Sequence, residues 1–311
     1  MTTSDTRLLV TGARGFIGRA ALLALAKQYG GASIHAVRKA NNGPVPLIPG
    51  VTWHTNDLLE KGSAEKLIEK IQPTHCLHAA WEARPPHFWT SPENEKWLAA
   101  SIALAEAFAK TGGKRFISLG SVAEYENTSG RMIENVTPEA PSTLYGQCKR
   151  AFHRHLATIS KDTGVLTSIG RIFYVYGPFE FETKLVASAC RAIALNEPVA
   201  FGALDLWRDY IHVNDLGRAI AILLESSLEG VVNLATGEPV RQSRLIETLA
   251  NLSHRGDLFH IGARPTQPHD PPILFADTQK IRSIGWRPEI SLEDGLQSTL
   301  KWWRAQLRHA A

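Results

Sequence analysis

The first half of the chain alternates between two hydrophobic patterns. Short runs of β-branched and other apolar residues, typical of buried strands, are separated by longer stretches with apolar residues at the i, i+3, i+4 and i+7 spacing of a helix. The short runs predict strands at residues 7–11, 33–37, 51–54, 76–79, 115–119 and 166–173, and the longer stretches predict helices at 18–29, 64–71, 95–110 and 143–161. Such alternation is typical of a parallel sheet covered by helices on both faces.

From about Gly177 onward the alternation becomes irregular, and prolines such as Pro178, Pro198 and Pro271 interrupt it. We therefore predict an α/β protein whose main body is a doubly wound, Rossmann-like parallel sheet. Residues 1–176 would form this nucleotide-binding domain, which we also expect to take in about 210–236. Residues 177–311 would build a smaller, interwoven α/β substrate lobe from separate segments.

The composition narrows the classes of partner. The 34 basic and 30 acidic residues give a net charge of +4 and are interspersed, which argues against nucleic-acid binding and is compatible with a small anionic substrate. The polar start of the chain gives no sign of a secretory signal, and no stretch reaches the ~18 apolar residues that span a membrane. Cys76, Cys148 and Cys190 have neither disulfide nor metal-ligand spacing. We expect a cytoplasmic protein that binds no metal, membrane or nucleic acid.

The first predicted strand is followed by TGARGFIG, which places Gly12, Gly15 and Gly18 three residues apart where a helix begins. A tight turn of this kind brings backbone N–H groups close to a pyrophosphate at the positive end of the helix, and the third glycine allows close packing of helix against sheet. The simpler alternative is a turn glycine followed by packing glycines. Because the motif lies where strand meets helix in the first unit, we favour dinucleotide binding.

The end of the second predicted strand bears on the choice between NAD and NADP. An acid at this position binds the ribose 2′-hydroxyl of NAD, whereas a basic residue accommodates the 2′-phosphate of NADP. The chain has Arg38 and Lys39 there with no acid nearby, and Arg14 lies inside the glycine turn. This pattern favours NADP(H). The alternative, in which Arg38 and Lys39 are ordinary solvated charges and NAD(H) is the cofactor, stays open.

Tyr145 is the one tyrosine of the sequence that a lysine, Lys149, follows four residues later. On the predicted helix this spacing places the two side chains on one face. A free tyrosine, with a pKa near ~10, is a weak acid–base at neutral pH, and a neighbouring ammonium group stabilises its phenolate. The alternative is a half-buried aromatic residue beside a lysine that extends into solvent. The spacing alone is weak evidence, so the context decides between them.

Together the motifs resemble those of the extended short-chain dehydrogenase/reductase family, in its NAD-dependent epimerase/dehydratase branch that acts on nucleotide sugars. The resemblance covers almost the whole chain. It rests on TGARGFIG at 11–18, HTNDLL at 54–59, HAA at 78–80, SLGSVAEYE at 118–126, RIFYVYGP at 171–178, WRDYIHVND at 207–215 and ADTQKIRSIGWRPEISLEDGL at 276–296. Each motif alone is modest, and the specificity lies in the ordered set.

The resemblance implies roles for residues of these motifs. Tyr145 would exchange the proton, Lys149 would stabilise its phenolate and hold the nicotinamide ribose, and Ser121 would hydrogen-bond the reacting carbonyl. Arg208 would bind the diphosphate of the nucleotide sugar, and Asp57 would contact the adenine. A homodimer through the helix of Tyr145 is implied as well. The expected cofactor-binding residues are Gly12, Arg14, Gly15, Phe16, Ile17, Gly18, Arg38, Asp57, Leu58, Ala79, Ala80, Tyr145 and Lys149.

The segment 81–97 follows the HAA motif and so begins at the carboxyl edge of the sheet, where ligands of this fold bind. Trp81 and Glu82 are the best candidates for contacts with the sugar, and Thr143, two residues before Tyr145, is a third. Residues 87–89 would form either a lid or, as we favour, a loop packed over the core. For Lys184 and Arg264 two alternatives stay open: contact with the nucleotide, or an ordinary charge on the surface.

Residues that the chain lacks narrow the reaction. Dehydratases of this family carry an Asp-Glu pair immediately after the catalytic Thr, where this chain has Val122 and Ala123. An epimerase-reductase of the family uses a Cys and a His at positions that are Ala123 and Phe179 here. Two reactions remain: reduction of a 4-keto nucleotide sugar by NADPH, which Arg14 and Arg38 favour, and NAD-dependent 4-epimerisation. A non-catalytic NADP-sensing regulator is a third alternative, although such proteins usually lose the tyrosine or the lysine.

Overall fold

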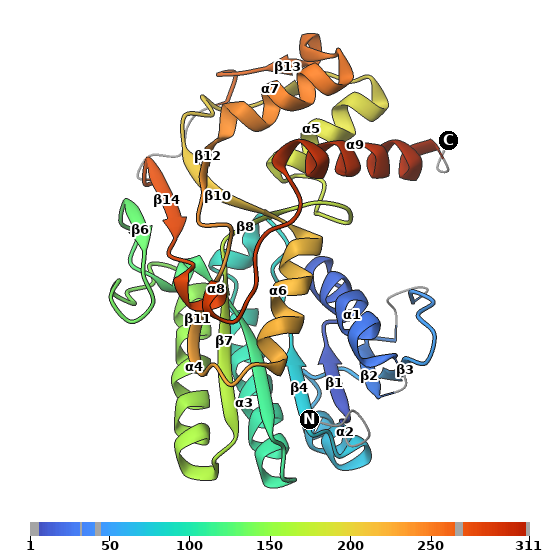
Figure 1. Ribbon diagram of the computed structural model, residues 1–311, viewed down its shortest axis with the longest axis vertical. Helices are drawn as coiled ribbons and strands as arrows, with labels where there is room; N and C mark the ends of the chain where they lie inside the picture. The colour runs from blue at the N-terminus through green and yellow to red at the C-terminus, as the bar shows by residue number, and fades with distance from the viewer. Residues whose placement is uncertain (1–5, 32, 41–44, 265–269, 309–311) are drawn as a thin grey trace.

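A seven-stranded parallel sheet forms the centre of the larger lobe, with strand order β11-β7-β5-β4-β1-β2-β3 (Figure 1). The computed structural model describes residues 6–31, 33–40, 45–264 and 270–308, so the polar start of the chain lies outside it. The strand order reverses between β1 and β4, which is where ligands bind in sheets of this kind. The strands are Leu8–Thr11 (β1), Ile34–Arg38 (β2), Thr52–Thr55 (β3), His75–His78 (β4), Arg115–Ser121 (β5), Leu166–Ile172 (β7) and Gly230–Leu234 (β11).

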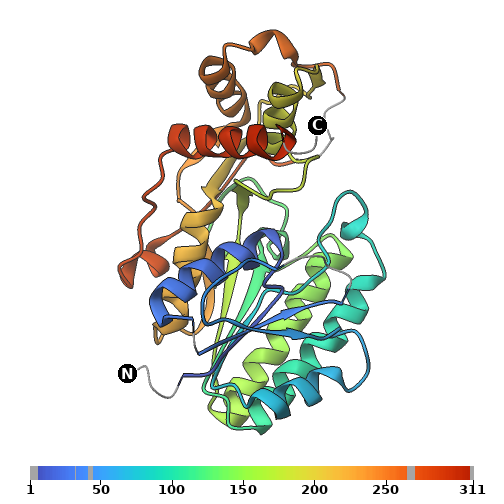
Figure 2. The same cartoon turned by 90° about the vertical axis from the view of Figure 1, so that its right-hand side faces the viewer.

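Helices cover both faces of this sheet because its strands bury alternate side chains on opposite sides. Leu8 and Val10 of β1 pack into the core with α1 (Phe16–Tyr29) and α6 (Val213–Glu225). Leu9, between them, packs into the second core with α2 (Ser63–Ile71), α3 (Glu93–Lys110) and α4 (Leu144–Thr163). Figure 2 shows the two helical layers with the sheet between them.

A smaller lobe lies beyond the carboxyl ends of the parallel strands (Figures 1 and 2). Its five-stranded sheet consists of Gly130–Met132 (β6), Tyr174–Tyr176 (β8), Trp207–His212 (β10), Pro239–Arg241 (β12) and Ile273–Ala276 (β14), and Val199–Ala200 (β9) pairs with Phe259–His260 (β13). Its helices are Leu185–Leu195 (α5), Gln242–Ser253 (α7) and Leu292–Arg308 (α9), whereas Gln279–Ser283 (α8) packs against β11 of the larger sheet, with Ile281 in the core that α1 and α6 share. The 3-10 helices within the described residues are His87–Trp89 (η2), Val122–Glu124 (η3) and Gly256–Leu258 (η4). The side chains of α5, α7 and α9 share one apolar core.

The predicted strands correspond to β1–β5 and β7, and the predicted helices to α1–α4, with ends that differ by a few residues. The expected α/β class with a doubly wound parallel sheet is therefore confirmed. The segments are interwoven, because β6 and β8 join the smaller sheet while α6 and β11 return to the larger one. Among the helices that the structure describes, none is long and apolar enough to cross a membrane.

Candidate active site

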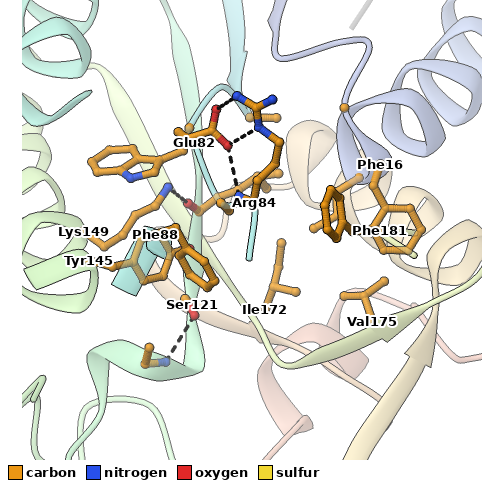
Figure 3. Close-up of a pocket in the computed structure, with 18 of the residues that line it drawn as sticks. Phe16, Glu82, Arg84, Phe88, Ser121, Tyr145, Lys149, Ile172, Val175 and Phe181 are labelled. Atoms are coloured by element: carbon orange, nitrogen blue, oxygen red, sulfur yellow. Dashed lines mark hydrogen bonds and ion pairs between the residues drawn. The ribbon is translucent and has the colours of Figure 1, made fainter. Parts of the chain in front are cut away.

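A cavity of about 1350 Å³ opens between the carboxyl edge of the large sheet and the smaller lobe. Every residue predicted to bind cofactor or substrate, or to act in catalysis, lines it except Asp57 and Arg208. The close-up in Figure 3 shows Tyr145, Lys149 and Ser121 gathered at one end, and Phe16, Val175 and Phe181 at the other. The sheet edge thus brings together side chains that are far apart in the sequence.

The turn between β1 and α1 has the form that a dinucleotide requires. Gly12 has a φ of 66°, and a Cβ there would lie 2.6 Å from the Ala80 nitrogen. A Cβ on Gly18 would lie 2.1 Å from the carbonyl oxygen of Gly12, so the helix can approach the turn only with glycine at this position. The N-terminal end of α1, which begins at Phe16, borders the cavity, and its free N–H groups suit a phosphate. The residues present therefore fit a dinucleotide.

Basic side chains surround the expected position of the adenosine ribose. Arg38 ends β2, and both Arg38 and Arg14 line the cavity. Lys39 lines it too, but its Nζ is 3.1 Å from Asp57 Oδ2. Asp57 also accepts a hydrogen bond from the Leu59 nitrogen at 3.1 Å, and its neighbour Leu58 reaches the cavity where Asp57 does not. Arg14, Arg38 and Lys39 therefore all bring a positive charge to this part of the cavity.

The Tyr145–Lys149 pair lies on the first turns of α4. Thr143 begins this helix, because its hydroxyl accepts a hydrogen bond from the Gly146 nitrogen at 3.2 Å. Lys149 Nζ donates to the Leu119 carbonyl oxygen at 2.9 Å and lies 4.0 Å from the centre of the Trp81 ring. The spacing of four residues therefore places both side chains in the cavity, beside the end of β5.

Ser121 occupies the last position of β5 and caps η3. Its hydroxyl accepts a hydrogen bond from the Ala123 nitrogen at 3.2 Å, which Figure 3 draws as a dashed line. It also interacts with Tyr145, since hydrogen bonding to Ser121 opposes the rise in the pKa of that phenol. Ser121, Tyr145 and Lys149 therefore form one cluster, as a shared role in proton transfer requires.

Burial dominates the acid–base properties of the pair. It raises the pKa of Tyr145 well above its ordinary value, and the nearby carboxylate of Glu124 raises it further. Burial likewise lowers the pKa of Lys149 to about 7, although Glu124 acts in the opposite direction by favouring the ammonium form. Glu124 therefore influences both groups, although the sequence motifs do not identify it as functional.

The sequence motifs do not identify two acidic residues that lie at this site. Glu124 is fully buried beside Ser121. The sequence feature that could have identified it is its position within the SLGSVAEYE motif, one residue before Tyr125. Glu180 lines the cavity at 8% exposure, and its Oε2 has no hydrogen-bond partner among the described residues. Burial raises the pKa of Glu180 to about 8, in part offset by Lys184, which also lines the cavity. Arg264 does not reach it.

Aromatic residues of the segment after β4 cover Tyr145. The Phe88 ring lies 5.1 Å from the Tyr145 ring, edge to face, and is 6% exposed, whereas Trp89 is 40% exposed. Trp81 Nε1 donates to Asn94 Oδ1 at 2.9 Å, which fixes the indole over Lys149. The Glu82 carboxylate binds Arg84 at 2.6 Å, as Figure 3 shows. Phe88 thus packs on the core and faces the cavity at once.

Arg208 does not join the other predicted substrate residues. Its guanidinium group is buried at 2% exposure and donates to the carbonyl oxygens of Trp207, at 2.9 Å, and of Pro271, at 2.7 Å. Asp270 Oδ2 lies 3.9 Å from Arg208 Nη2. Asp270 lines the cavity, whereas Arg208 does not. Because backbone carbonyls already occupy Nη1 and the group does not line the cavity, diphosphate binding by Arg208 stays a prediction. Among the described residues no cluster of His, Cys, Asp or Glu could hold a metal ion.

Comparisons with known proteins agree with this geometry. Residues 8–235 match the model of the NAD dependent epimerase/dehydratase family. The chain is 28% identical to a UDP-glucose 4-epimerase of Azospirillum brasilense, over 98% of this chain and 94% of that protein. It is 25% identical to a GDP-6-deoxy-D-mannose reductase of Pseudomonas aeruginosa, over 97% and 98% of the two chains. The structure of a UDP-glucose 4-epimerase of Thermotoga maritima with UDP-glucose matches with a TM-score of 0.87 at 25% identity, covering 96% of this chain and 99% of its own.

Proposed function

Because the chain belongs to the NAD dependent epimerase/dehydratase family, we propose that it is an NADPH-dependent reductase that converts the 4-keto group of a nucleotide sugar into a hydroxyl. Membership confirms the resemblance to extended short-chain dehydrogenases/reductases. It places the protein among the enzymes that epimerise, dehydrate or reduce nucleotide sugars. The choice of NADPH and of reduction within this family is the proposal.

The single observation that carries the proposal is the charge at the end of β2. Binding of the NAD 2′-hydroxyl calls for an acid there, and β2 ends instead in Arg38. Arg14, from the glycine turn, lines the same cavity, so two guanidinium groups can meet a 2′-phosphate. The family's description names NAD, and the preference for NADP(H) is inferred from these two residues of this chain.

In the proposed reaction Tyr145 is the proton donor. Bound NADPH would supply the hydride that reaches C4 of the sugar. The Ser121 hydroxyl would hydrogen-bond the ketone oxygen, and Tyr145 would give its proton to that oxygen as the negative charge develops. Lys149, anchored on the Leu119 carbonyl, would then hold its ammonium group close to the remaining phenolate. The chain's own residues thus bind the carbonyl, donate the proton and stabilise the charge left behind.

The other reactions of the family are less well supported. Val122 and Ala123 line the cavity directly after Ser121, so the side chains placed where a dehydratase has its acids cannot transfer a proton. A 4-epimerase would need only Ser121, Tyr145 and Lys149, and the names of the epimerase relatives support it as the alternative. A non-catalytic sensor is the weakest reading, because these three side chains converge in one cavity.

The decisive experiment is a redox balance. The protein would be incubated with NADPH and a panel of 4-keto nucleotide sugars with different bases, and in parallel with the corresponding 4-hydroxy sugars. We expect NADPH to be consumed in proportion to a 4-hydroxy product. Isomerisation of a 4-hydroxy nucleotide sugar without net change in the cofactor would support the epimerase instead.

A further inference from the structure

A buried carboxylate lies beside Ser121. Glu124 is fully shielded from solvent, and its Oε1 accepts a hydrogen bond of 2.7 Å from the Ser121 nitrogen, which completes a capping box in η3. Its other oxygen, Oε2, is 2.5 Å from His153 Nδ1 and 3.1 Å from Arg171 Nη2. An ionised carboxylate is costly to bury unless it is paired and hydrogen-bonded. Both oxygens meet these conditions, so the site is built for a charged Glu124.

Glycines make room for this arrangement. A Cβ on Gly120 would lie 2.6 Å from Glu124 Oε1 and 2.9 Å from His153 Cε1, closer than non-bonded atoms can approach. A Cβ on Gly146, the residue after Tyr145, would lie 2.4 Å from the Ala123 carbonyl oxygen. The two glycines therefore allow η3, which carries Glu124, to pack against the start of α4, which carries Tyr145 and Lys149.

We propose that Glu124 is a positioning residue, which fixes the backbone of Ser121 and holds a permanent negative charge near Tyr145 so that the phenol keeps its proton until the ketone accepts it. This inference rests on the proposed function for the direction of the reaction. Its effect on Tyr145 can nevertheless be measured without any substrate.

The placement suits a reductase better than an enzyme that begins by oxidising its substrate. A reductase needs the protonated phenol at the start of each turnover, whereas oxidation of a sugar hydroxyl needs the phenolate as base. A neighbouring carboxylate disfavours the phenolate and favours the ammonium form of Lys149. Glu124 therefore biases both groups toward the protonation states from which reduction starts.

The surrounding groups keep Glu124 ionised. Burial by itself would raise its pKa, but the contacts with His153 and Arg171 and the hydrogen bond from the Ser121 nitrogen lower that pKa to about 2. Arg171 also donates to Glu139 Oε1 at 2.7 Å, so its positive charge is shared between two carboxylates. The charged and titratable groups that face Glu124 are Tyr145, Lys149 and His153 of α4 and Arg171 of β7, whose guanidinium group also lies over the Tyr125 ring.

The direct test is the ionisation of Tyr145 in the NADP⁺ complex. Tyrosinate absorbance would be titrated in the wild type and in Glu124→Gln, and the same titration of the Tyr145→Phe form of each protein would be subtracted. We expect the midpoint of the Tyr145 titration to lie at least about one pH unit lower in Glu124→Gln than in the wild type, which is the usual effect of removing one neighbouring charge. The high-pH decline of kcat for ketone reduction should move down by the same amount.

Glu139→Gln is the matched control, because it removes the other carboxylate of Arg171 without touching Ser121. We expect its Tyr145 titration to stay close to that of the wild type. An equal shift in both variants would overturn the proposal, since the effect would then come from Arg171. An unshifted titration in Glu124→Gln would overturn it as well.

Glu124→Asp keeps the charge while shortening the side chain, and it decides the matter if Glu124→Gln fails to fold. We expect an unchanged Tyr145 titration and a kcat lowered by roughly tenfold or more, because the Ser121 N–H loses its acceptor. A lower midpoint of the Tyr145 titration in this variant would contradict the effect of the Glu124 charge on Tyr145. An unchanged kcat would contradict the effect of Glu124 on the position of Ser121. Failure of the wild type to reduce any 4-keto nucleotide sugar would count against the proposed function and would leave the titrations valid.

Discussion

Replacing Arg38 with Ala should separate the binding of NADPH from that of NADH. In the proposed complex Arg38 makes a charge-assisted hydrogen bond to the 2′-phosphate, an interaction that contributes about 1.5–3 kcal/mol. Its loss should weaken NADPH binding by about 10- to 150-fold, since ~1.4 kcal/mol corresponds to tenfold in Kd. NADH has no 2′-phosphate, so its Kd should change by less than about threefold on the same reasoning.

Lys39→Ala is the natural control, because Lys39 also lines the cavity. Its Nζ binds Asp57 Oδ2 at 3.1 Å, with both side chains about one-third or more exposed. An ion pair between the exposed Lys39 ammonium group and a 2′-phosphate would contribute about 0–1 kcal/mol, so the loss of Lys39 should weaken NADPH binding by no more than about fivefold. Arg14→Ala should resemble Arg38→Ala, because both guanidinium groups line the cavity.

Isothermal titration calorimetry at one fixed ionic strength would measure these constants, since salt screens the interactions of exposed charges. Two results would rule out a 2′-phosphate contact by Arg38. One is a Kd of the wild type that is lower for NADH than for NADPH. The other is an equal weakening of both cofactors in Arg38→Ala, which would point to a disturbed fold instead of a lost phosphate contact.

Two further variants probe the proton chemistry. Tyr145→Phe should lower turnover by at least about 100-fold through loss of the proton donor while leaving the Kd of NADPH within about threefold, and full activity would contradict the assigned role. Glu180→Gln tests the buried carboxyl group, whose pKa rises from 4.5 to about 8 on folding. The folded state holds this proton more tightly, so the wild type loses stability as the pH rises from about 4.5 to 8, by up to a few kcal/mol. Urea unfolding at pH 5 and pH 8.5, about the ends of this range, would give the free energies of unfolding of both proteins. We expect the variant to become more stable relative to the wild type at the higher pH. An equal difference in the free energy of unfolding at both pH values would contradict the burial effect.

The larger lobe was predictable because its elements are long enough to carry a hydrophobic period. The helix of Tyr145 has 20 residues, and its buried stripe of Cys148, Phe152, Leu156 and Ile159 is visible in the sequence. The smaller lobe has strands of two to six residues, in which alternation cannot be recognised. Its pairings also join distant segments, as β14 pairs with β6 across more than a hundred residues.

The candidate site shows the same division. Gly12, Gly18, Tyr145 and Lys149 lie within single motifs whose spacing is set by one turn or one helix, so their positions could be predicted. The buried position of Glu124 depends on partners from three elements, including Arg171 of β7. The residues next to Glu124 in the sequence do not indicate that it is buried. Arg208 follows a motif, but its Nη1 donates to the carbonyl oxygen of Pro271, which lies 63 residues away in the sequence.

An isotopic label would show whether the enzyme carries out net reduction by NADPH. NADPH carrying deuterium at C4 of the nicotinamide would be supplied with a 4-keto nucleotide sugar, and the product examined by NMR and mass spectrometry. We expect one deuterium at C4 of the product sugar and one NADP⁺ for each molecule formed. Interconversion of 4-hydroxy epimers without deuterium in the sugar, and with no NADP⁺ released, would contradict it.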